Sequence, residues 1–228
     1  MQPVDNPLAV VRSVRPSIAG LRILDIGCGA GNFAGQLAAE GAEVVGIDPG
    51  VDAIRAAMAA VPQANFVEGV AEALPFDTAT FDLCTMINAF HHVPEMAMQT
   101  ALREAARIIR PNGIVIIVEP LPTGTFFSAL RLVEDETVVR LAAQRAIETA
   151  IQSGVLSRMA TLNYVRRDVF PTADGFLDRI VAVDPSRREI VEQNKSAVRT
   201  AVLAAAARDS EGSLIFDQPI KADILERA

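Results

Sequence analysis

The sequence predicts an α/β fold in which helices cover both faces of a parallel, doubly wound sheet. Short apolar segments alternate with helical segments through the first half of the chain, as they do in such folds. The apolar segments are continuous runs rather than alternating ones, which is typical of strands buried on both faces. The strands expected in this half are residues 21–26, 42–48, 64–68, 81–87 and 114–119.

Three helices are expected between these strands, at residues 31–40, 52–61 and 94–110. Phe33 and Leu37 lie one helical turn apart, so the first helix has an apolar side for the sheet. Pro62 ends the second helix and Pro94 opens the third, positions at which a missing N–H is tolerated.

The second half of the chain is richer in helical segments and carries no motif. Helices are expected at 125–153, 172–183 and 185–208, and strands at 164–170 and 213–225. Pro219 lies inside the last of these strands and predicts an edge strand or a bulge, because proline cannot donate to a central ladder.

Composition narrows the class of protein. The chain has 228 residues, of which 50% are hydrophobic, so it has material for one packed core and is expected to form a single domain over 1–228. The formal net charge is −7, which does not build the basic surface that nucleic acid requires. Nucleic acid is therefore not an expected partner.

The sequence has two cysteines, Cys28 and Cys84, and two histidines, His91 and His92. This excludes a disulfide-stapled secreted fold and a three-histidine metal site, and no metal is expected. The longest apolar runs are about six residues, against the ~20 that cross a bilayer. The N-terminus lacks the basic start and apolar run of a signal peptide. A cytoplasmic protein without a membrane span is expected.

A glycine-rich loop carries the chemical signal. One strand ends in Asp25, glycines follow at positions 27, 29 and 31, and a helix then begins. Glycine lets the backbone turn sharply and lets a ligand approach the main chain closely. Asp48 ends the next strand, where a carboxylate can accept hydrogen bonds from both hydroxyls of a ribose. The spacing therefore predicts a nucleoside-containing cofactor.

Two cofactor classes use this geometry. The dinucleotide fingerprint G-x-G-x-x-G, counted from Gly27, needs glycine where this chain has Asn32. Counted from Gly29, it ends on Ala34, which that fingerprint tolerates. Asp25 would repel a pyrophosphate but would suit an ammonium group. A nicotinamide-dependent oxidoreductase thus stays open as an alternative function.

Residues 25–31 (DIGCGAG) resemble motif I of the class I S-adenosylmethionine-dependent methyltransferases. Three later segments resemble the family's following motifs in the right order, at 67–76, 81–93 and 102–120. The most similar branch contains the methyltransferases of ubiquinone and menaquinone biosynthesis. Four motifs in order are a specific signal, whereas one glycine loop would be weak.

The resemblance implies a Rossmann-like sheet of seven strands, mostly parallel, with the last strand antiparallel and added helices in the C-terminal half. It implies a cofactor-binding core over 20–120, a helical region over 121–212 that covers the substrate, and a closing strand over 213–225. The implied activity is transfer of a methyl group to O, N or C of a small-molecule acceptor, with S-adenosylhomocysteine as product. A monomer or a homodimer is expected.

The resemblance also implies roles for single residues. The loop would line the methionine part of the cofactor, Asp25 would face its amino group through water, and Asp48 would hold the ribose. Adenine would lie beside Pro49 and accept a hydrogen bond from the N–H of Ala71. The expected cofactor-binding residues are Asp25, Gly27, Cys28, Gly29, Gly31, Asp48, Pro49, Val70, Ala71 and Asn88.

Val70 departs from the family pattern, which usually has an aspartate there that accepts a hydrogen bond from the adenine amino group. Valine cannot accept one, although Glu72 stands close enough in sequence to replace it. We therefore expect Val70→Asp to tighten cofactor binding. The departure also keeps open a third function, a non-catalytic cofactor-binding regulator.

His91 is the predicted catalytic base. Both histidines follow the fourth strand, at the sheet edge where ligands bind in α/β folds, and histidine titrates near neutral pH. A phenol, carboxylic acid or activated carbon must lose a proton before it accepts a methyl group, whereas a neutral amine need not. Glu119, at the tip of the fifth strand, is the second candidate. His92 is expected to anchor the loop.

Overall fold

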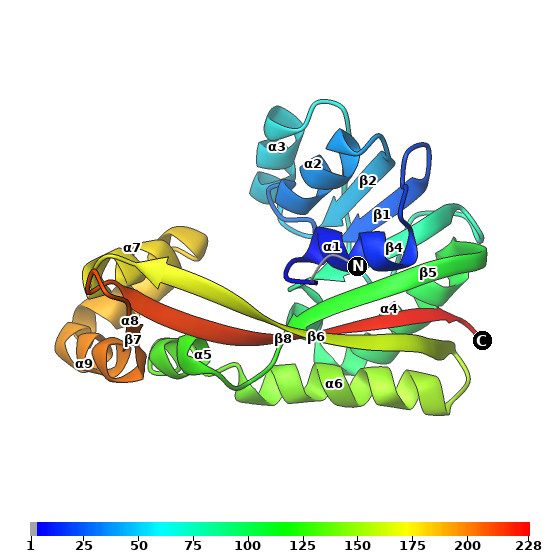
Figure 1. Cartoon of the computed structure of the whole chain (residues 1–228). Coiled ribbons are helices and arrows are strands. Elements are labelled where there is room, and N and C mark those ends of the chain that lie inside the picture. The colour runs from blue at the N-terminus through cyan, green and yellow to red at the C-terminus, as the bar shows by residue number, and fades with distance from the viewer. Residues whose placement is uncertain (1–3) are drawn as a thin grey trace. The chain divides into compact units, whose positions relative to one another are not determined.

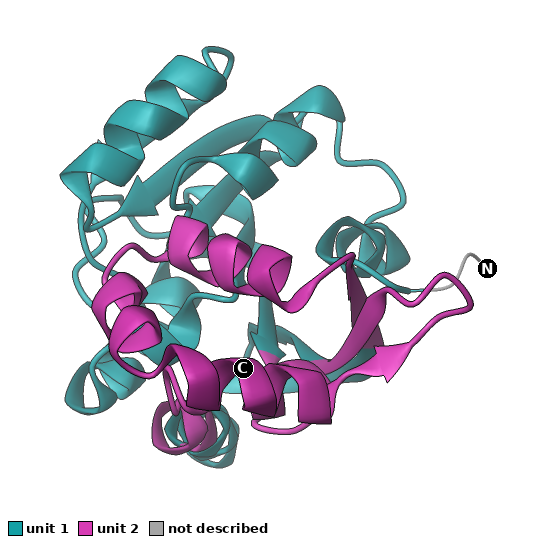
Figure 2. Cartoon of the chain, turned by 90° about the vertical axis from the view of Figure 1, so that its left-hand side faces the viewer, with its two compact units in different colours: residues 1–119, 142–164, 221–228 teal, residues 120–141, 165–220 magenta. Residues whose placement is uncertain are grey.

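The structure is a computed structural model that describes residues 4–228 (Figure 1). It divides into two compact units (Figure 2). The first comprises residues 1–119, 142–164 and 221–228, and the second comprises residues 120–141 and 165–220. Each unit is described separately below.

One sheet follows the strand order β3-β2-β1-β4-β5-β8-β6, and the short strand β7 pairs with β8 outside this path. Strands β3, β2, β1, β4 and β5 pair in parallel, and the C-terminal strand is antiparallel. The strands are β1 (Arg22–Ile26), β2 (Glu43–Asp48), β3 (Asn65–Glu68), β4 (Phe81–Ile87), β5 (Ile109–Pro120), β6 (Leu156–Phe170), β7 (Ala207–Arg208) and β8 (Leu214–Arg227). The predicted α/β class and seven-stranded order are confirmed, with the two-residue β7 as an addition.

The predicted helices of the first half correspond to α2, α3 and α4 within two residues at each end. The helices are α1 (Pro7–Val14), α2 (Asn32–Ala39), α3 (Val51–Ala60), α4 (Glu95–Ile108), α5 (Thr125–Leu130), α6 (Thr137–Gln152), α7 (Ala173–Val183), α8 (Arg187–Gln193) and α9 (Lys195–Ala205). A 3-10 turn, η1 (Phe90–His92), follows β4. Helix α1 and η1 were not expected from the sequence. No helix in residues 4–228 combines the length and the apolar character that crossing a membrane requires.

The core of the first unit explains why its strands are continuous apolar runs. Leu24, Phe81, Met86 and Ile117 come from three neighbouring strands, and each is fully buried or nearly so. Burying such a side chain stabilises the fold by about 1.5–3 kcal/mol. The hydrophobic effect therefore holds together the strands whose carboxyl ends form one edge of the sheet, where β2 ends in Asp48.

The expected helix over 125–153 is wrong, because the structure breaks it into α5 and α6. Asp135 accepts hydrogen bonds from both the N–H (3.0 Å) and the hydroxyl of Thr137, so its side chain caps the start of α6. The Thr137 hydroxyl and then the Arg131 guanidinium lower the pKa of Asp135 to about 2. The segment 185–208 is likewise two helices, α8 and α9, which meet at Asn194.

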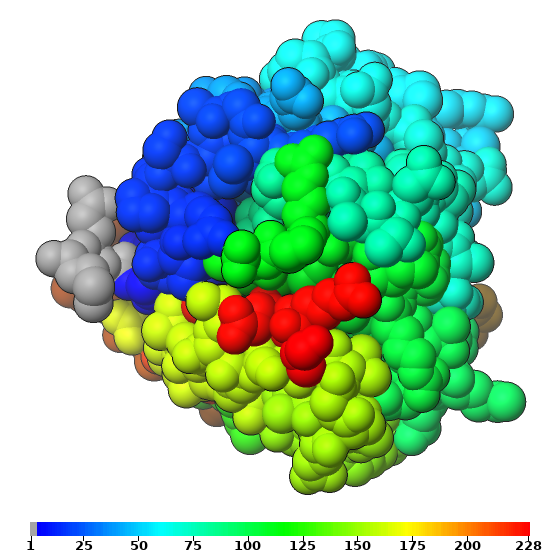
Figure 3. Space-filling model, turned by 90° about the vertical axis from the view of Figure 1, so that its right-hand side faces the viewer, coloured from blue at the N-terminus to red at the C-terminus, as the bar shows by residue number. Residues whose placement is uncertain are grey.

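The closing strand also differs from expectation. Strand β8 lies between β5 and β6, so the edge position predicted from Pro219 is wrong. The Pro219 carbonyl accepts the N–H of Leu121 (2.9 Å), one residue past the end of β5. A residue without an N–H is tolerated there because the neighbouring strand is ending. Figure 3 shows the C-terminal segment of the chain lying between the β5 and β6 segments.

The second unit has an aromatic core of its own. Phe176 and Phe216 are fully buried with ring centroids 4.8 Å apart, and Phe170 lies 5.2 Å from Phe176. Phe126 packs 5.3 Å from Phe176. Aromatic pairs at these spacings contribute about 0.5–1.5 kcal/mol beyond their buried area. Phe126 is partly buried and packs against this core.

Candidate active site

The first unit holds a cavity of about 460 Å³ at the carboxyl ends of its central strands. This volume lies within the range of small-molecule sites, and this edge of an open α/β sheet is where ligands bind. The lining residues are Ile26, Gly27, Asp48, Pro49, Val70, Ala71, Glu72, Met86, Asn88, Ala89, Phe90, His92, Val93 and Pro94.

The glycine loop requires glycine for two reasons. Its glycines at 27, 29 and 31 have φ angles of 71°, 52° and 79°, in the left-handed region that other residues avoid. A Cβ on Gly27 would also lie 2.5 Å from the Cβ of Ala89, closer than two carbons can approach. Gly27 lines the cavity, whereas Gly29 and Gly31 shape the turn outside the lining.

Asp48 ties the end of β2 to the glycine loop. Its Oδ2 accepts the N–H of Gly29 (2.9 Å) and its Oδ1 accepts the N–H of Gly50 (2.8 Å). An ionised carboxylate has about four acceptor positions, so it retains capacity to accept from two further donors. The side chain faces the cavity with this capacity, which suits a pair of ribose hydroxyls.

Asp25 is placed differently. It is 2% exposed, does not line the cavity, and accepts a hydrogen bond from Thr85 Oγ1 (2.8 Å) on β4. Burial raises the pKa of Asp25 to about 7, which outweighs the hydrogen bond from Thr85, and the nearby Asp48 charge adds to the rise. A carboxyl group in this position acts on a ligand only indirectly.

Cys28 is buried below the loop and does not line the cavity. Burial raises the pKa of its thiol to about 12, with further contributions from the charges of Asp25 and Asp48. Only the thiolate is nucleophilic, so Cys28 is not placed for nucleophilic catalysis. Its sulfur lies 2.8 Å from where a Cβ on Gly46 would stand, so it occupies space that glycine leaves on β2.

The segment after β3 lines the other side of the cavity. Val70, Ala71 and Glu72 all face it, and Val70 is 38% exposed. The position where the family pattern has an aspartate is thus part of the cavity wall. Glu72, the residue expected to substitute for that aspartate, lines it as well.

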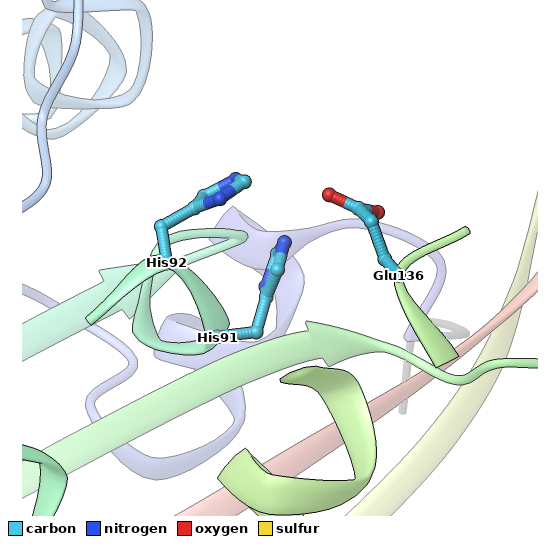
Figure 4. Close-up of side chains that lie close together, drawn as sticks. All are labelled: His91, His92 and Glu136. Atoms are coloured by element: carbon cyan, nitrogen blue, oxygen red, sulfur yellow. The ribbon is translucent and has the colours of Figure 1, made fainter. Parts of the chain in front are cut away.

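The segment between β4 and α4 contributes most of the remaining wall. Asn88 has a φ of 54°, and its N–H donates to the carbonyl of Val118 (2.7 Å). The turn η1 then places His91 and His92 side by side, with ring centroids 4.0 Å apart (Figure 4). His92 lines the cavity, whereas His91 is 2% exposed and does not.

His91 is held by Glu119 rather than facing the cavity. Its Nδ1 pairs with Glu119 Oε2. Glu119 Oε1 accepts the N–H groups of Ala89 (3.1 Å) and Phe90 (2.8 Å). The two residues that sequence reasoning offered as alternative bases therefore bind each other. His92, expected to anchor the loop, occupies the position that can contact a ligand.

Sequence reasoning missed several lining residues between β4 and α4, namely Ala89, Phe90, Val93 and Pro94. Their side chains are apolar and carry no group that identifies a binding site. Their position was the available signal, because the chain that follows a central strand borders the ligand edge of an α/β sheet. Met86 is both buried and in the lining.

Residues 24–117 match the family model of a methyltransferase domain. Residues of this chain are 38% identical over 133 positions to a ubiquinone biosynthesis O-methyltransferase of Azorhizobium caulinodans, covering 57% of this chain and 51% of that protein. They are 38% identical over 100 positions to an uncharacterized methyltransferase of Synechocystis sp., covering 44% and 47%. The chain thus spans about half the length of these curated relatives.

The solved structure of the YcgJ protein from Bacillus subtilis has a similar fold over nearly the whole length of both chains. The TM-score is 0.63, the sequence identity is 23%, and the match covers 97% of this chain and 98% of that one. The shared fold therefore extends beyond the residues that the family model matches.

Methyltransferases of this class take the methyl group from S-adenosylmethionine, and the cavity fits that molecule. Gly27 lines the cavity without a side chain, Asp48 offers free acceptor capacity, and Val70 and Ala71 provide an apolar wall for a base. Residues 24–117 thus match a methyltransferase domain, as the motifs predicted, and the chain has the Rossmann-like fold of the solved structure.

Proposed function

We propose that this chain transfers a methyl group from S-adenosylmethionine to an oxygen, nitrogen or carbon atom of a small-molecule acceptor. The observation that carries the proposal is the hydrogen bond from the N–H of Gly29 to Asp48. Asp48 lines the cavity, and both residues lie inside the methyltransferase domain. One relative is named for ubiquinone biosynthesis and O-methylation, which supports a small acceptor and makes oxygen the first atom to test.

The lining residues form three groups, one for each part of the cofactor. Asp48 holds the ribose hydroxyls, and Gly27 and Asn88 border the methionine part. Pro49, Val70 and the N–H of Ala71 border the adenine. Asp25 acts through the loop and β4 rather than by direct contact, because its carboxyl group is buried against Thr85.

The bound cofactor supplies a methyl group already activated by a positively charged sulfur. The residues of this chain then have to hold donor and acceptor in line, which can lower a barrier by several kcal/mol. The apolar side chains of Met86 and Phe90 exclude water from this part of the cavity. His92 is a lining residue that can take a proton from an oxygen acceptor, and His91 is a positioning residue beside it.

We further propose that residues 121–212 cover the acceptor and that residues 1–228 work as one methyltransferase domain, as a monomer or a homodimer in the cytoplasm. Free, buried Cys28 and Cys84 support a reducing compartment. The net charge of −7 supports an acceptor other than nucleic acid.

Isothermal titration calorimetry of the full chain with S-adenosylhomocysteine, with NAD as the comparison, tests the proposal. We expect micromolar binding of the first and none of the second. Binding of NAD alone would favour the oxidoreductase. Binding of S-adenosylhomocysteine without methyl transfer from labelled donor to any acceptor in a small-molecule panel would favour the regulator.

A further inference from the structure

We propose that Glu119 is a positioning residue that holds the wall of the cofactor cavity in its binding conformation by clamping three consecutive residues, Ala89 to His91. The inference rests on the proposed function, since it assigns the role to binding of S-adenosylmethionine or its product. It differs from the expectation that Glu119 or His91 acts as the base.

The clamp consists of three interactions made by one carboxylate. Oε1 accepts from the N–H groups of Ala89 (3.1 Å) and Phe90 (2.8 Å), and Oε2 pairs with His91 Nδ1. Glu119 is 2% exposed, so these bonds replace water almost completely. A buried carboxylate needs such donors, because leaving it without them is costly.

The clamped segment is the cavity wall. Ala89 and Phe90 line the cavity, as do Asn88 and His92 on either side of the clamped residues. Ala89 also abuts the glycine loop, at the place where a Cβ on Gly27 would lie 2.5 Å from its own. A shift of the segment would therefore change both the wall and its contact with Gly27.

Within the segment, the N–H of His92 donates to the carbonyl of Ala89 (3.1 Å) and the N–H of Val93 to that of Phe90 (3.1 Å), which closes one short turn. Asn88 lies in the left-handed region, with its N–H bound to Val118, and η1 is a single 3-10 turn. Short 3-10 turns have poor hydrogen-bond geometry, and non-glycine residues adopt a positive φ only when the surroundings hold them there. The Glu119 carboxylate provides that hold from β5, about 30 residues further along the chain.

Two substitutions separate the two functions of Glu119, which are to accept the backbone N–H groups and to fix the tautomer of His91. An ionised carboxylate only accepts, so the proton shared with His91 lies on Nδ1. In Glu119→Gln, the amide oxygen can still accept from the two backbone N–H groups. Its NH₂ would then face Nδ1, so the proton of a neutral His91 would move to Nε2. Glu119→Ala removes both functions.

The experiment measures S-adenosylhomocysteine binding by calorimetry for the full chain, Glu119→Ala, Glu119→Gln and a control, Asp223→Asn. Asp223 is a carboxylate of β8 that is equally buried (1% exposed), bound to Arg158 and Thr161, and not among the lining residues of the cavity. We expect Glu119→Ala to raise Kd at least about tenfold, Glu119→Gln to stay within about threefold, and the control to bind like the wild type.

Equal binding by wild type and a folded Glu119→Ala would overturn the clamp while leaving the proposed function intact. A tenfold loss in Asp223→Asn would also overturn it, since the effect would then be general to buried carboxylates. Absence of binding in the wild type would instead sink the proposed function.

Nitrogen NMR of histidine-labelled protein adds a measurement that does not depend on Glu119→Ala folding. We expect the Nδ1–H form of His91 in the wild type and the Nε2–H form in Glu119→Gln. We also expect slow hydrogen exchange at the amides of Ala89 and Phe90 in both proteins. Fast exchange of these amides in the wild type, or an unchanged His91 tautomer in Glu119→Gln, would contradict the clamp.

Discussion

The candidate cofactor site belongs to the first unit, whereas an aromatic core dominates the second. In the first unit, Asp48 and His92 line one cavity, and the buried Glu119 holds part of its wall from behind. In the second unit the centre is a cluster of phenylalanines, and polar groups satisfy one another, as Arg187 and Glu134 do. The motifs that predict a cofactor site thus lie in the first unit. The second unit is held by apolar packing, which produces no recognisable sequence motif.

The largest effect is expected from Phe216→Ala. Phe216 is fully buried against Phe176 and Phe170, and truncating such a ring costs about 3–5 kcal/mol of stability. Denaturant unfolding measures this loss, with Leu203→Ala as a control because Leu203 is 40% exposed. Every described lining residue of the cavity belongs to the first unit, so S-adenosylhomocysteine affinity should hold. A loss of S-adenosylhomocysteine affinity in Phe216→Ala would contradict the assignment of the site to the first unit alone.

Asp48→Ala should nearly abolish cofactor binding with a smaller loss of stability. The variant loses the acceptors for Gly29 and Gly50 as well as those for the ribose. Charge-assisted hydrogen bonds of this kind give a loss of at least about a hundredfold in affinity. Calorimetry measures it, with Asp52→Ala as the control because the Asp52 side chain is 96% exposed. Similar affinities in the two variants would remove Asp48 from the site.

Asp25→Asn should change how stability depends on pH. Burial raises the pKa of Asp25 from 3.8 to about 7, so the folded protein keeps a proton that the unfolded chain releases. Stability from this group is present below pH ~4 and is lost as the pH rises through ~7. Asparagine does not ionise, so the Tm of the variant relative to wild type should increase from pH 5 to pH 8. A difference that is constant across this range would contradict the buried, protonated carboxyl.

The smallest effect is expected from Val70→Asp. The added carboxylate would accept a hydrogen bond from the adenine amino group at a position that is 38% exposed and lines the cavity. Partial solvent access limits the gain to about tenfold in S-adenosylhomocysteine affinity. Val70→Asn is the matched variant, since its amide oxygen accepts without the charge. Unchanged or weaker binding by Val70→Asp would show that Glu72 or water already fills this role.

Much of the fold could be predicted because its signals are local. Continuous apolar runs located β1 to β4 within a residue at each end, and the strand–glycine–helix spacing located the cofactor edge. The prediction failed where a side chain competes with the backbone. Asp135 accepts from the N–H of Thr137, the first residue of α6, in the segment that separates α5 from α6.

The candidate site was predicted in part for a related reason. Gly27, Asp48 and Asn88 could be found because motif spacing and strand ends are sequence properties. The roles of the two histidines could not, since the partner of His91 and the exposure of each ring to the cavity depend on the tertiary structure. The 3-10 geometry of η1 directs His91 to Glu119 and leaves His92 in the cavity wall.

The sequence by itself determined the α/β class, the strands of the first half, the glycine loop and the carboxylate at the end of β2. Periodicity and short-range spacing encode these features, because they depend on neighbours within one element. Only the tertiary structure decided that β8 lies inside the sheet, that Asp25 is buried against Thr85, and that Glu119 holds the segment after β4. Each of these depends on contacts between residues about 30 to 100 positions apart, and those contacts form only when strands pair.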